Sequence, residues 1–340
     1  MRKMDVLSNL NHLKLPKLDF KDKQILFLLD TNARLSYVQI SKHTKLSKDS
    51  VRYRISALQK KEVLKGTRAI ININKLGYDS YHLFIQFNRP LEEIEEKIIP
   101  KLEKHKFIRA ILSFSGKYDL ELAIVAKSVN KFDLAMEKII LDCGNYLENY
   151  IVLITTQSYI NRSIPLSFYN KPIKNKSNIS NKKSLPENFK LDIKDKQILN
   201  EISNNATKLY YQIGNDVGLS ADAVTRRIKR MQRLGIIEKF VPVVNYSNLA
   251  YGTYALLVQI KNLTSQKKST LKQLLSKDKN VIWATHSIGN YNLLMYLCVK
   301  DTNNVHFTLN QIRNYFPEDC NNYEVMIANK EYKYTYLPDF

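Results

Sequence analysis

The sequence predicts an α+β protein in which one unit, a three-helix head followed by a ferredoxin-like βαββαβ sandwich, occurs twice. The segment Leu18–Leu26 returns as Leu191–Leu199 with eight of nine positions identical. Without a gap, residues 18–87 match residues 191–260 at 26 of 70 positions. In each copy, the spacing of apolar residues changes from a helical period to a strand-like period. We therefore expect two equivalent units, offset by 173 positions.

The head of each copy is predicted to hold three helices. In the first copy Asp19 is placed to cap a helix, and a break at 32–34 separates it from a second helix near Tyr37. Ser47 is placed to cap a third helix, in which Val51, Ile55 and Leu58 fall on one face. The second copy repeats this pattern with Leu219, Ser220, Val224, Ile228 and Met231. Two helices joined by a short turn, the second capped by Ser, predict a helix-turn-helix.

The sandwich of each copy is predicted from alternating apolar runs separated by helical segments. In the first copy these are the strands 81–87, 108–114, 119–126 and 150–156 and the helices 91–104 and 131–141. In the second copy they are the strands 254–260, 281–286, 293–299 and 323–328 and the helices 268–276 and 305–315. The order β-α-β-β-α-β leaves one face of each sheet without helices and free to pair with another sheet.

Composition narrows the class of partner. The chain carries 53 Lys and Arg against 32 Asp and Glu, a net charge of +21, which favours an anionic polymer as partner. No apolar run approaches the roughly 18 residues that span a bilayer, so we expect a cytoplasmic protein without membrane contact. The three cysteines lie far apart, and there is no CxxC pair, Walker A or GxGxxG pattern. We therefore expect no disulfide, no metal site and no bound cofactor.

The third helix carries the strongest functional signal, because both copies place basic residues on it with a single acid. Such a helix enters the major groove of double-stranded DNA and meets base edges and phosphates. The alternative is a solvated basic face. The candidate contacts are Lys48, Ser50, Arg52, Tyr53 and Arg54 in the first copy, and Thr225, Arg226, Arg227, Lys229 and Arg230 in the second. Because the two sets differ, we expect the heads to read different base sequences.

In these residues the chain resembles a tandem fusion of two Lrp/AsnC-type (feast/famine) transcriptional regulators. The resemblance rests on LDxKDKQIL, on Leu46-Ser47 followed by Val51 and Arg54-Ile55, and on the Gly-x-Tyr-Asp turn at 116–119. It implies sequence-specific DNA binding by a winged helix-turn-helix. It also implies a ligand-sensing βαββαβ domain that dimerises through its sheet.

The resemblance further implies that a small effector, such as an amino acid, binds between sandwiches near the Gly-x-Tyr-Asp turn. Carried over, the effector residues are Gly116, Tyr118 and Asp119 in the first copy and Gly289, Tyr291 and Asn292 in the second. Asn292 stands where the first copy has an acid, so we expect two unequal sites. For the two glycines the alternative is plain turn geometry with positive φ.

These observations divide the chain into six segments. They are a basic leader (1–17), a winged helix-turn-helix (18–77), a sandwich (78–160), a polar linker (161–190), a second winged helix-turn-helix (191–251) and a second sandwich (252–334). Since a single-copy relative must dimerise to cover its sheet, we expect the two sandwiches to pair within one chain as a pseudo-dimer. A higher homo-oligomer stays open, as the resemblance implies.

An enzymatic alternative also has a resemblance behind it. The two-part architecture of the chain also resembles that of siroheme decarboxylases. In addition, His286 lies just before the Gly-Asn-Tyr turn of the second copy. The six histidines otherwise occur singly, without HExxH or metal-ligand spacing. We therefore expect a regulator and not an enzyme. An RNA-binding adaptor is disfavoured, because no stacking aromatics are organised on a sheet face.

Overall fold

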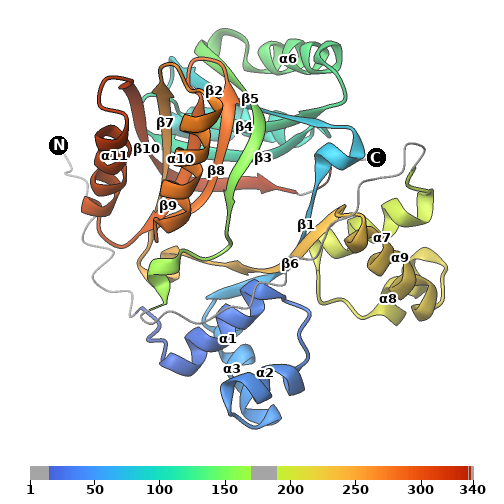
Figure 1. Ribbon diagram of the computed structural model, residues 1–340. Helices are drawn as coiled ribbons and strands as arrows, with labels where there is room; N and C mark the ends of the chain where they lie inside the picture. The colour runs from blue at the N-terminus through green and yellow to red at the C-terminus, as the bar shows by residue number, and fades with distance from the viewer. Residues whose placement is uncertain (1–14, 170–189, 336, 338–340) are drawn as a thin grey trace.

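The computed structural model describes residues 15–169, 190–335 and 337. The expected leader and linker therefore fall largely outside the described residues. Figure 1 shows two helical heads next to a larger body built from two sheets and their covering helices. The predicted α+β fold, with its two copies of a head followed by a sandwich, is confirmed.

Each head contains the three expected helices. They are α1 (Phe20–Thr31), α2 (Tyr37–Thr44) and α3 (Lys48–Lys60) in the first head, and α7 (Ile193–Asn204), α8 (Tyr210–Val217) and α9 (Ala221–Arg233) in the second. The side chain of Asp19 accepts the N–H of Asp22 at the start of α1, and Asp22 returns the bond to the N–H of Asp19. Asp192 and Asp195 form the same reciprocal pair at the start of α7. This arrangement satisfies N–H groups that a helix start leaves unpaired.

The strand that follows each head finds its partner in the other copy. Strand β1 (Leu64–Ile71) pairs antiparallel with β6 (Ile237–Val244) in a two-stranded sheet. Ala69 and Ile71 of β1 pack into the core of the second head. In return α1 packs on β6, so each head is completed by residues of the other copy. Short 3₁₀ helices at Ile73–Leu76 and Ser247–Leu249 lead from these strands into the sandwiches.

Both sandwiches have the predicted order of elements. The first contains β2 (Asp79–Phe87), α4 (Leu91–Lys97), α5 (Ile99–Glu103), β3 (Ile108–Ser115), β4 (Leu120–Ala126), α6 (Val129–Cys143) and β5 (Leu147–Asn161). The second contains β7 (Gly252–Ile260), α10 (Ser265–Lys277), β8 (Val281–Ile288), β9 (Leu293–Val299), α11 (Asn303–Tyr315) and β10 (Cys320–Tyr334). The helix expected over 91–104 is broken into α4 and α5, because Pro100 lies at the start of the second piece.

The last strand of each sandwich is 15 residues long and belongs to both copies. Strand β5 pairs with β2 of its own sandwich up to Ile154, and then with β8 of the other sandwich. Strand β10 pairs with β7 up to Ile327, and then with β3. The eight strands thereby form one closed sheet in the order β10-β3-β4-β2-β5-β8-β9-β7. Within the described structure, the two sandwiches are thus paired inside one chain.

Three apolar layers result from this closure. Each sandwich has its own core between sheet and helices, around Leu83 and Ile124 in the first copy and Leu256 and Met295 in the second. A further cluster lies between the two sheets and joins side chains of both copies, among them Phe84, Tyr118, Leu257, Tyr291 and Met326. No helix in the described ranges is long and apolar enough to cross a membrane.

The first part of the expected linker, residues 161–169, is packed on the protein. Arg162 donates from Nη1 to the carbonyls of Asp278 and Val281, at 2.8 and 3.0 Å. Ile164 and Phe168 are buried in the core of the first head. The chain therefore leaves β5 through a fixed segment that runs along the first head. The rest of the expected linker lies outside the described residues.

Because the closed sheet needs no second chain, we expect the intact protein to stay monomeric on dilution. Both edges of each sandwich are paired internally, which removes the usual site for strand addition. Light scattering of the DNA-free protein over a range of concentrations measures this. A dimer that persists at the lowest concentration would contradict pairing within one chain. A larger assembly that forms only at high concentration would leave one chain as the minimal unit.

Candidate nucleic-acid interface

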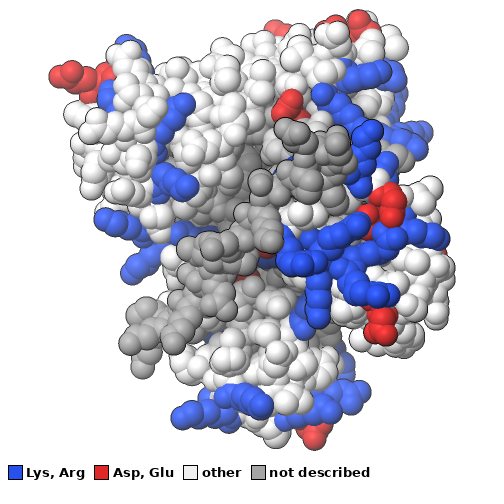
Figure 2. Space-filling model, turned by 45° about the vertical axis from the view of Figure 1, so that its right-hand side comes forward, with Lys and Arg blue, Asp and Glu red and all other residues white. Residues whose placement is uncertain are grey.

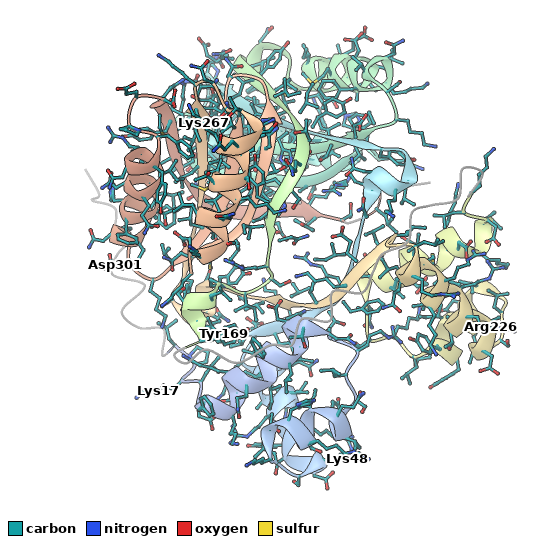
Figure 3. The ribbon with its side chains drawn as sticks, viewed as in Figure 1. Lys17, Lys48, Tyr169, Arg226, Lys267 and Asp301 are labelled. Carbon is teal, nitrogen blue, oxygen red and sulfur yellow. The ribbon has the colours of Figure 1, made fainter. Side chains whose placement is uncertain are left out.

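The third helix of each head lies on its outer side. Val51, Ile55 and Leu58 anchor α3 in the first head, and the corresponding face of α9 is buried in the second. Figure 3 shows Lys48 at the outer end of the first head and Arg226 on the outer edge of the second, both away from the sheets. The helix-turn-helix expected from the sequence thus presents both third helices outward.

The turn before each third helix is formed in the same way in both heads. Lys45 ends α2 with φ 54°, and Gly218 ends α8 with φ 66°, so both take the left-handed conformation that stops a helix. Ser47 then caps α3 by accepting the N–H of Ser50 at 3.1 Å, and Ser220 caps α9 by accepting the N–H of Ala223 at 3.2 Å. These caps fix where each third helix begins.

Most predicted DNA contacts are exposed on these helices. Lys48, Arg52 and Tyr53 are exposed on α3, Tyr53 with 75% of its surface accessible. Arg226 and Lys229 are exposed on α9. Figure 2 shows basic side chains gathered on the side of the molecule that carries the second head, with a further row on the first head.

Two predicted contacts are only partly exposed and have partners within their own helix or cap. Ser50 bonds the hydroxyl of Ser47 at 2.8 Å, and Thr225 donates its hydroxyl to the carbonyl of Ala221 at 2.8 Å. Both residues nevertheless lie in the first two turns of their helices, where base contacts are expected.

Arg54 and Arg227, two of the predicted contacts, form ion pairs inside their own heads. Nη1 of Arg54 lies 2.7 Å from carboxylate oxygens of both Asp19 and Asp22. Nη1 of Arg227 lies 2.6 Å from Asp192 and 2.8 Å from Asp195. We call each arginine with its two aspartates an Asp–Arg clamp. The clamp ties the third helix to the start of the first, so these guanidinium groups are engaged before DNA arrives.

Burial and the neighbouring hydrogen bonds and charge shift the pKa of Asp19 and of Asp192 in opposite directions. Burial alone would raise the pKa of Asp19, but the N–H of Asp22 and the guanidinium of Arg54 outweigh it and hold that pKa below its usual value. The pKa of Asp192 is lowered in the same way, against burial, by the N–H of Asp195 and by Arg227. Both aspartates are therefore ionised partners of the arginines near neutral pH.

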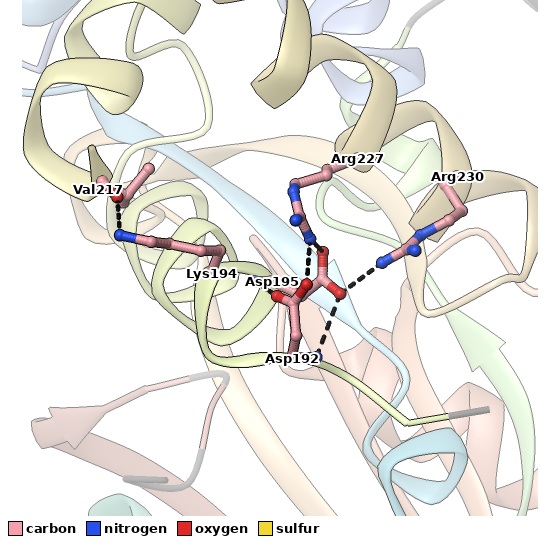
Figure 4. Close-up of polar contacts among 6 residues, drawn as sticks. All are labelled: Asp192, Lys194, Asp195, Val217, Arg227 and Arg230. Carbon is pink, nitrogen blue, oxygen red and sulfur yellow. Dashed lines mark hydrogen bonds and ion pairs between the residues drawn. The ribbon is translucent and has the colours of Figure 1, made fainter. Parts of the chain in front are cut away.

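The second clamp has one more arginine than the first. Arg230 also contacts Asp195, whereas the first copy has Ala57 at the corresponding position. Figure 4 shows Arg227 and Arg230 converging on the carboxylates, with Lys194 reaching the carbonyl of Val217 at the end of α8. Lys21 makes the equivalent bond to the carbonyl of Thr44 at 2.6 Å. Arg230 is therefore a less available DNA contact than the sequence suggested.

The expected effector residues are mostly used to build the turns themselves. Gly116 and Gly289 have φ of 150° and 141°, and a Cβ would lie 2.9 Å from Cγ of Met326 and 2.5 Å from the carbonyl of Val152. These glycines are required by close approach as well as by φ. Tyr118 and Tyr291 are each 2% exposed and pack between the sheets.

Asp119 and Asn292 each accept a hydrogen bond from a main-chain N–H at the equivalent position of their copies. Asp119 accepts the N–H of Phe87 at 2.7 Å. Asn292 accepts the N–H of Ile260 at 2.9 Å and donates to its carbonyl at 2.7 Å. Burial raises the pKa of Asp119, although the bond from Phe87 works against it. The difference between acid and amide therefore does not by itself distinguish a ligand site.

A charged pair that sequence reasoning missed lies at the first turn. Nζ of Lys117 is 2.8 Å from Oε1 of Glu324, and the hydroxyl of Tyr291 donates to the same oxygen at 3.3 Å. Lys117 comes from the first copy and Glu324 from the second, so only the paired sheets bring them together. At the corresponding turn the residues are Asn290 and Ile151, which carry no charge.

His82 and His286 of the body are hydrogen-bonded to neighbouring side chains. Nδ1 of His286 lies 2.6 Å from the hydroxyl of Thr156. Burial lowers the pKa of His286, and Lys268 lowers it further. Nδ1 of His82 lies 2.5 Å from Oε1 of Glu121 in the interior, where Tyr296 also donates to Glu121. Among the residues that the structure describes, no group of His, Cys, Asp and Glu is arranged to hold a metal ion.

Comparisons with known proteins bear on both heads. Residues 18–65 match a family described as winged helix-turn-helix DNA-binding, and residues 191–232 match the AsnC-type helix-turn-helix domain. The chain is 32% identical to the HTH-type transcriptional regulator LrpA of Pyrococcus horikoshii over 110 residues, which are 32% of this chain and 77% of that protein. It is 29% identical to the regulatory protein AsnC of Haemophilus influenzae over 112 residues, 33% of this chain and 74% of that protein.

The whole two-copy architecture also has a solved counterpart. The crystal structure of the siroheme decarboxylase NirDL covers 94% of this chain and 94% of its own, with a TM-score of 0.61. Sequence identity in that comparison is 11%, so the likeness is one of fold alone.

We expect Arg54→Ala to destabilise the first head by about 1–2 kcal/mol, since hydrogen bonds between charged groups are lost and Asp22 keeps no second arginine. Arg227→Ala should cost less, because Arg230 still holds Asp195. Hydrogen exchange of the α1 and α7 amides in the two variants measures both effects. Equal loss in both heads would contradict the role of Arg230.

The contribution of Asp19 should also depend on pH with a definite sign. Because its folded pKa is lowered, the stabilisation is complete above the unfolded value of about 4 and is lost as pH falls through the folded pKa. The difference between wild type and Arg54→Ala should therefore shrink below about pH 4. Urea unfolding at pH 7 and pH 3, followed by circular dichroism, tests this; a constant difference would contradict it.

Proposed function

The chain belongs to the Lrp/AsnC family of transcriptional regulators, and we propose that a single chain binds double-stranded DNA through two unequal helix-turn-helix heads. The observation that carries this proposal is the matched pair of outward third helices, each held by an Asp–Arg clamp and each carrying exposed basic residues. Two linked heads raise each other's effective concentration on neighbouring half-sites.

We propose that DNA is contacted by the predicted residues that the clamps leave accessible. These are Lys48, Ser50, Arg52 and Tyr53 on α3, and Thr225, Arg226 and Lys229 on α9. Residues in the first two turns are placed for base edges and the later basic residues for phosphates. Since the two sets differ, the preferred site is an imperfect palindrome whose half-sites lie about one helical turn, or a multiple, apart.

Arg52→Ala and Arg226→Ala should each weaken DNA binding and reduce the salt slope of log K by about 0.9 per lost phosphate contact. Lys272→Ala, which removes an exposed lysine from α10 on the second sandwich, is the matched control and should leave both quantities unchanged. Gel-shift titrations at several salt concentrations measure affinity and slope together. Unchanged binding by folded Arg52→Ala and Arg226→Ala proteins would refute the assignment.

We further propose that a small zwitterion such as an amino acid is sensed at the first turn, between Lys117 and Glu324. The support is chemical: Lys117 offers a cation for a carboxylate, and Glu324 offers an anion for an ammonium group. The corresponding turn has Asn290 and Ile151 and lacks both charges. We still propose two unequal sites, but the acid that distinguishes them is Glu324 and not Asp119.

A thermal-shift screen of amino acids should identify a ligand that stabilises the protein, by about 2.7 kcal/mol at a concentration of 100 Kd. Glu324→Gln and Lys117→Gln should each abolish that shift, because each removes one charged partner. Asn290→Ala at the other turn is the control and should preserve it. Full stabilisation of both charge variants, or none of the wild type by any amino acid, would contradict the proposal.

We propose regulation and not catalysis as the role of the chain. The relatives that match part of its sequence, at 29–32% identity, are named regulators. The siroheme decarboxylase is similar in fold, and its sequence identity to this chain is 11%. His286, the residue that favoured an enzyme, bonds Thr156. That contact gives the histidine a structural partner within the closed sheet.

A further inference from the structure

The two heads touch each other directly, across the β1–β6 ribbon. The turn between α1 and α2 donates the N–H of Ala33 to the carbonyl of Phe240 at 3.0 Å. The turn between α7 and α8 donates the N–H of Ala206 to the carbonyl of Thr67, also at 3.0 Å. The two bonds are equivalent under the repeat offset. Each head therefore adds its first turn to the strand of the other copy.

One side chain breaks this equivalence. Nη2 of Arg34 donates to the carbonyl of Lys208 at 3.0 Å, and Nη1 donates to the carbonyl of Ala206. Its guanidinium carbon lies 4.2 Å from the centre of the Tyr210 ring and 5.4 Å from that of Phe240. All four of these partners belong to the second copy.

The equivalent residue of the second copy makes a much smaller contact. Thr207 places its hydroxyl 3.1 Å from the hydroxyl of Thr67. Neither a ring nor a carbonyl pair from the first copy is engaged in the same way. Arg34 thus forms a one-sided link between the two heads.

The position of this link matters for the third helices. Arg34 lies in the turn that leads into α2, which packs on α3, and Tyr210 is the first residue of α8, which packs on α9. The heads are also connected by the β1–β6 ribbon and by the packing of each ribbon strand against the head of the other copy. The twist between strands is larger in a two-stranded ribbon than in a wider sheet. A planar fork of donors stacked between rings restrains such twisting in a way that a threonine does not.

We propose that Arg34 is a positioning residue that fixes the separation and angle of α3 and α9, and hence the half-site spacing that the chain accepts on DNA. The last step rests on the proposed DNA binding, whereas the effect on the heads does not. Arg34 itself faces the second head, and we do not assign it a DNA contact.

The effect on the heads is tested without DNA. Spin labels at Lys48→Cys and Lys229→Cys report the distance between α3 and α9, and the three native cysteines are buried. The intact protein should give one narrow distance distribution, which Arg34→Ala broadens and Thr207→Ala leaves narrow. Arg34→Lys keeps the charge without the planar fork and should also broaden it. Equally narrow distributions for wild type and Arg34→Ala would overturn the proposal.

The consequence for DNA is tested with sites selected from random duplexes by the full-length protein, then re-spaced one base pair at a time. Each base pair of altered spacing should cost the wild type about tenfold in affinity, as one mismatched base pair does. Arg34→Ala should bind the re-spaced sites within about threefold of each other. Arg52→Ala is the control, and it should lower affinity at every spacing and keep the spacing profile.

The outcomes separate the two proposals. A spacing profile that is equally sharp for wild type and Arg34→Ala would overturn the assignment of Arg34 to spacing. Absence of DNA binding by the wild type would refute the proposed function, while the spin-label distances would still decide whether Arg34 holds the heads. Thermal melting of each variant identifies any that has lost its fold, and Arg34→Lys then serves in place of Arg34→Ala.

Discussion

The structure depends on two strands that each belong to two sheets. The first half of each of these strands, β5 and β10, pairs within its own sandwich, and the second half pairs with the other sandwich. The change of partner falls at Ile154 in β5 and at Ile327 in β10. Without the second halves, each sandwich would keep unpaired edges, which soluble proteins protect. With them, the sheets close on each other and bury the aromatic cluster between them. The same closure brings β1 beside β6 and so sets the heads side by side.

The interior of the closed sheet also shows why the two copies are not interchangeable. His82 and Glu121 of the first copy have Ala255 and Leu294 as their counterparts in the second. Conversely, Trp283 and Tyr296 of the second copy correspond to Ala110 and Ala123 in the first. The large and polar residues of the two copies therefore meet on one side of the interface, where the ring of His82 lies 5.5 Å from that of Trp283. The bond from Tyr296 to Glu121 joins the two sets, and a buried carboxylate needs such partners. In a pair of two first copies, Ala123 would stand in place of Tyr296 and leave Glu121 without this bond, so the interface favours pairing of unlike copies.

Much of the head was predictable, because residues of the repeated nine-residue segment have capping, hydrogen-bonding, ion-pairing or core roles. Asp19 caps α1, Lys21 reaches the end of α2, Asp22 binds Arg54, and Ile25 and Leu26 are core. The use of Arg54 inside the head was not predicted, since its charge alone indicates neither a phosphate nor a carboxylate partner. The signal was present, however: all three members of the Asp–Arg clamp recur at the repeat offset.

The body shows a different limit of prediction. Strand β5 was expected to end at 156, because polar residues such as Gln157 and Ser158 interrupt its apolar alternation. Those residues pair with β8, whose position depends on residues far along the chain. The Lys117–Glu324 pair was hidden for the same reason, since it forms only where the copies meet. Contacts between copies follow from the closed sheet, and local periodicity carries no information about them.

Covalent duplication gives this chain a freedom that a homodimer lacks. In a symmetric dimer, any residue at the head junction occurs twice and must suit its environment on both sides. Here Arg34 meets Tyr210 and Phe240, while the counterpart of Phe240 is Thr67 and faces Thr207 instead. The junction thus holds one large stacked contact and one small hydroxyl contact. If Thr207 were also an arginine, it would face Thr67, which offers no ring like that of Phe240 beside Arg34. The junction fixes the heads with unequal contacts because each of its residues needs to suit only one partner.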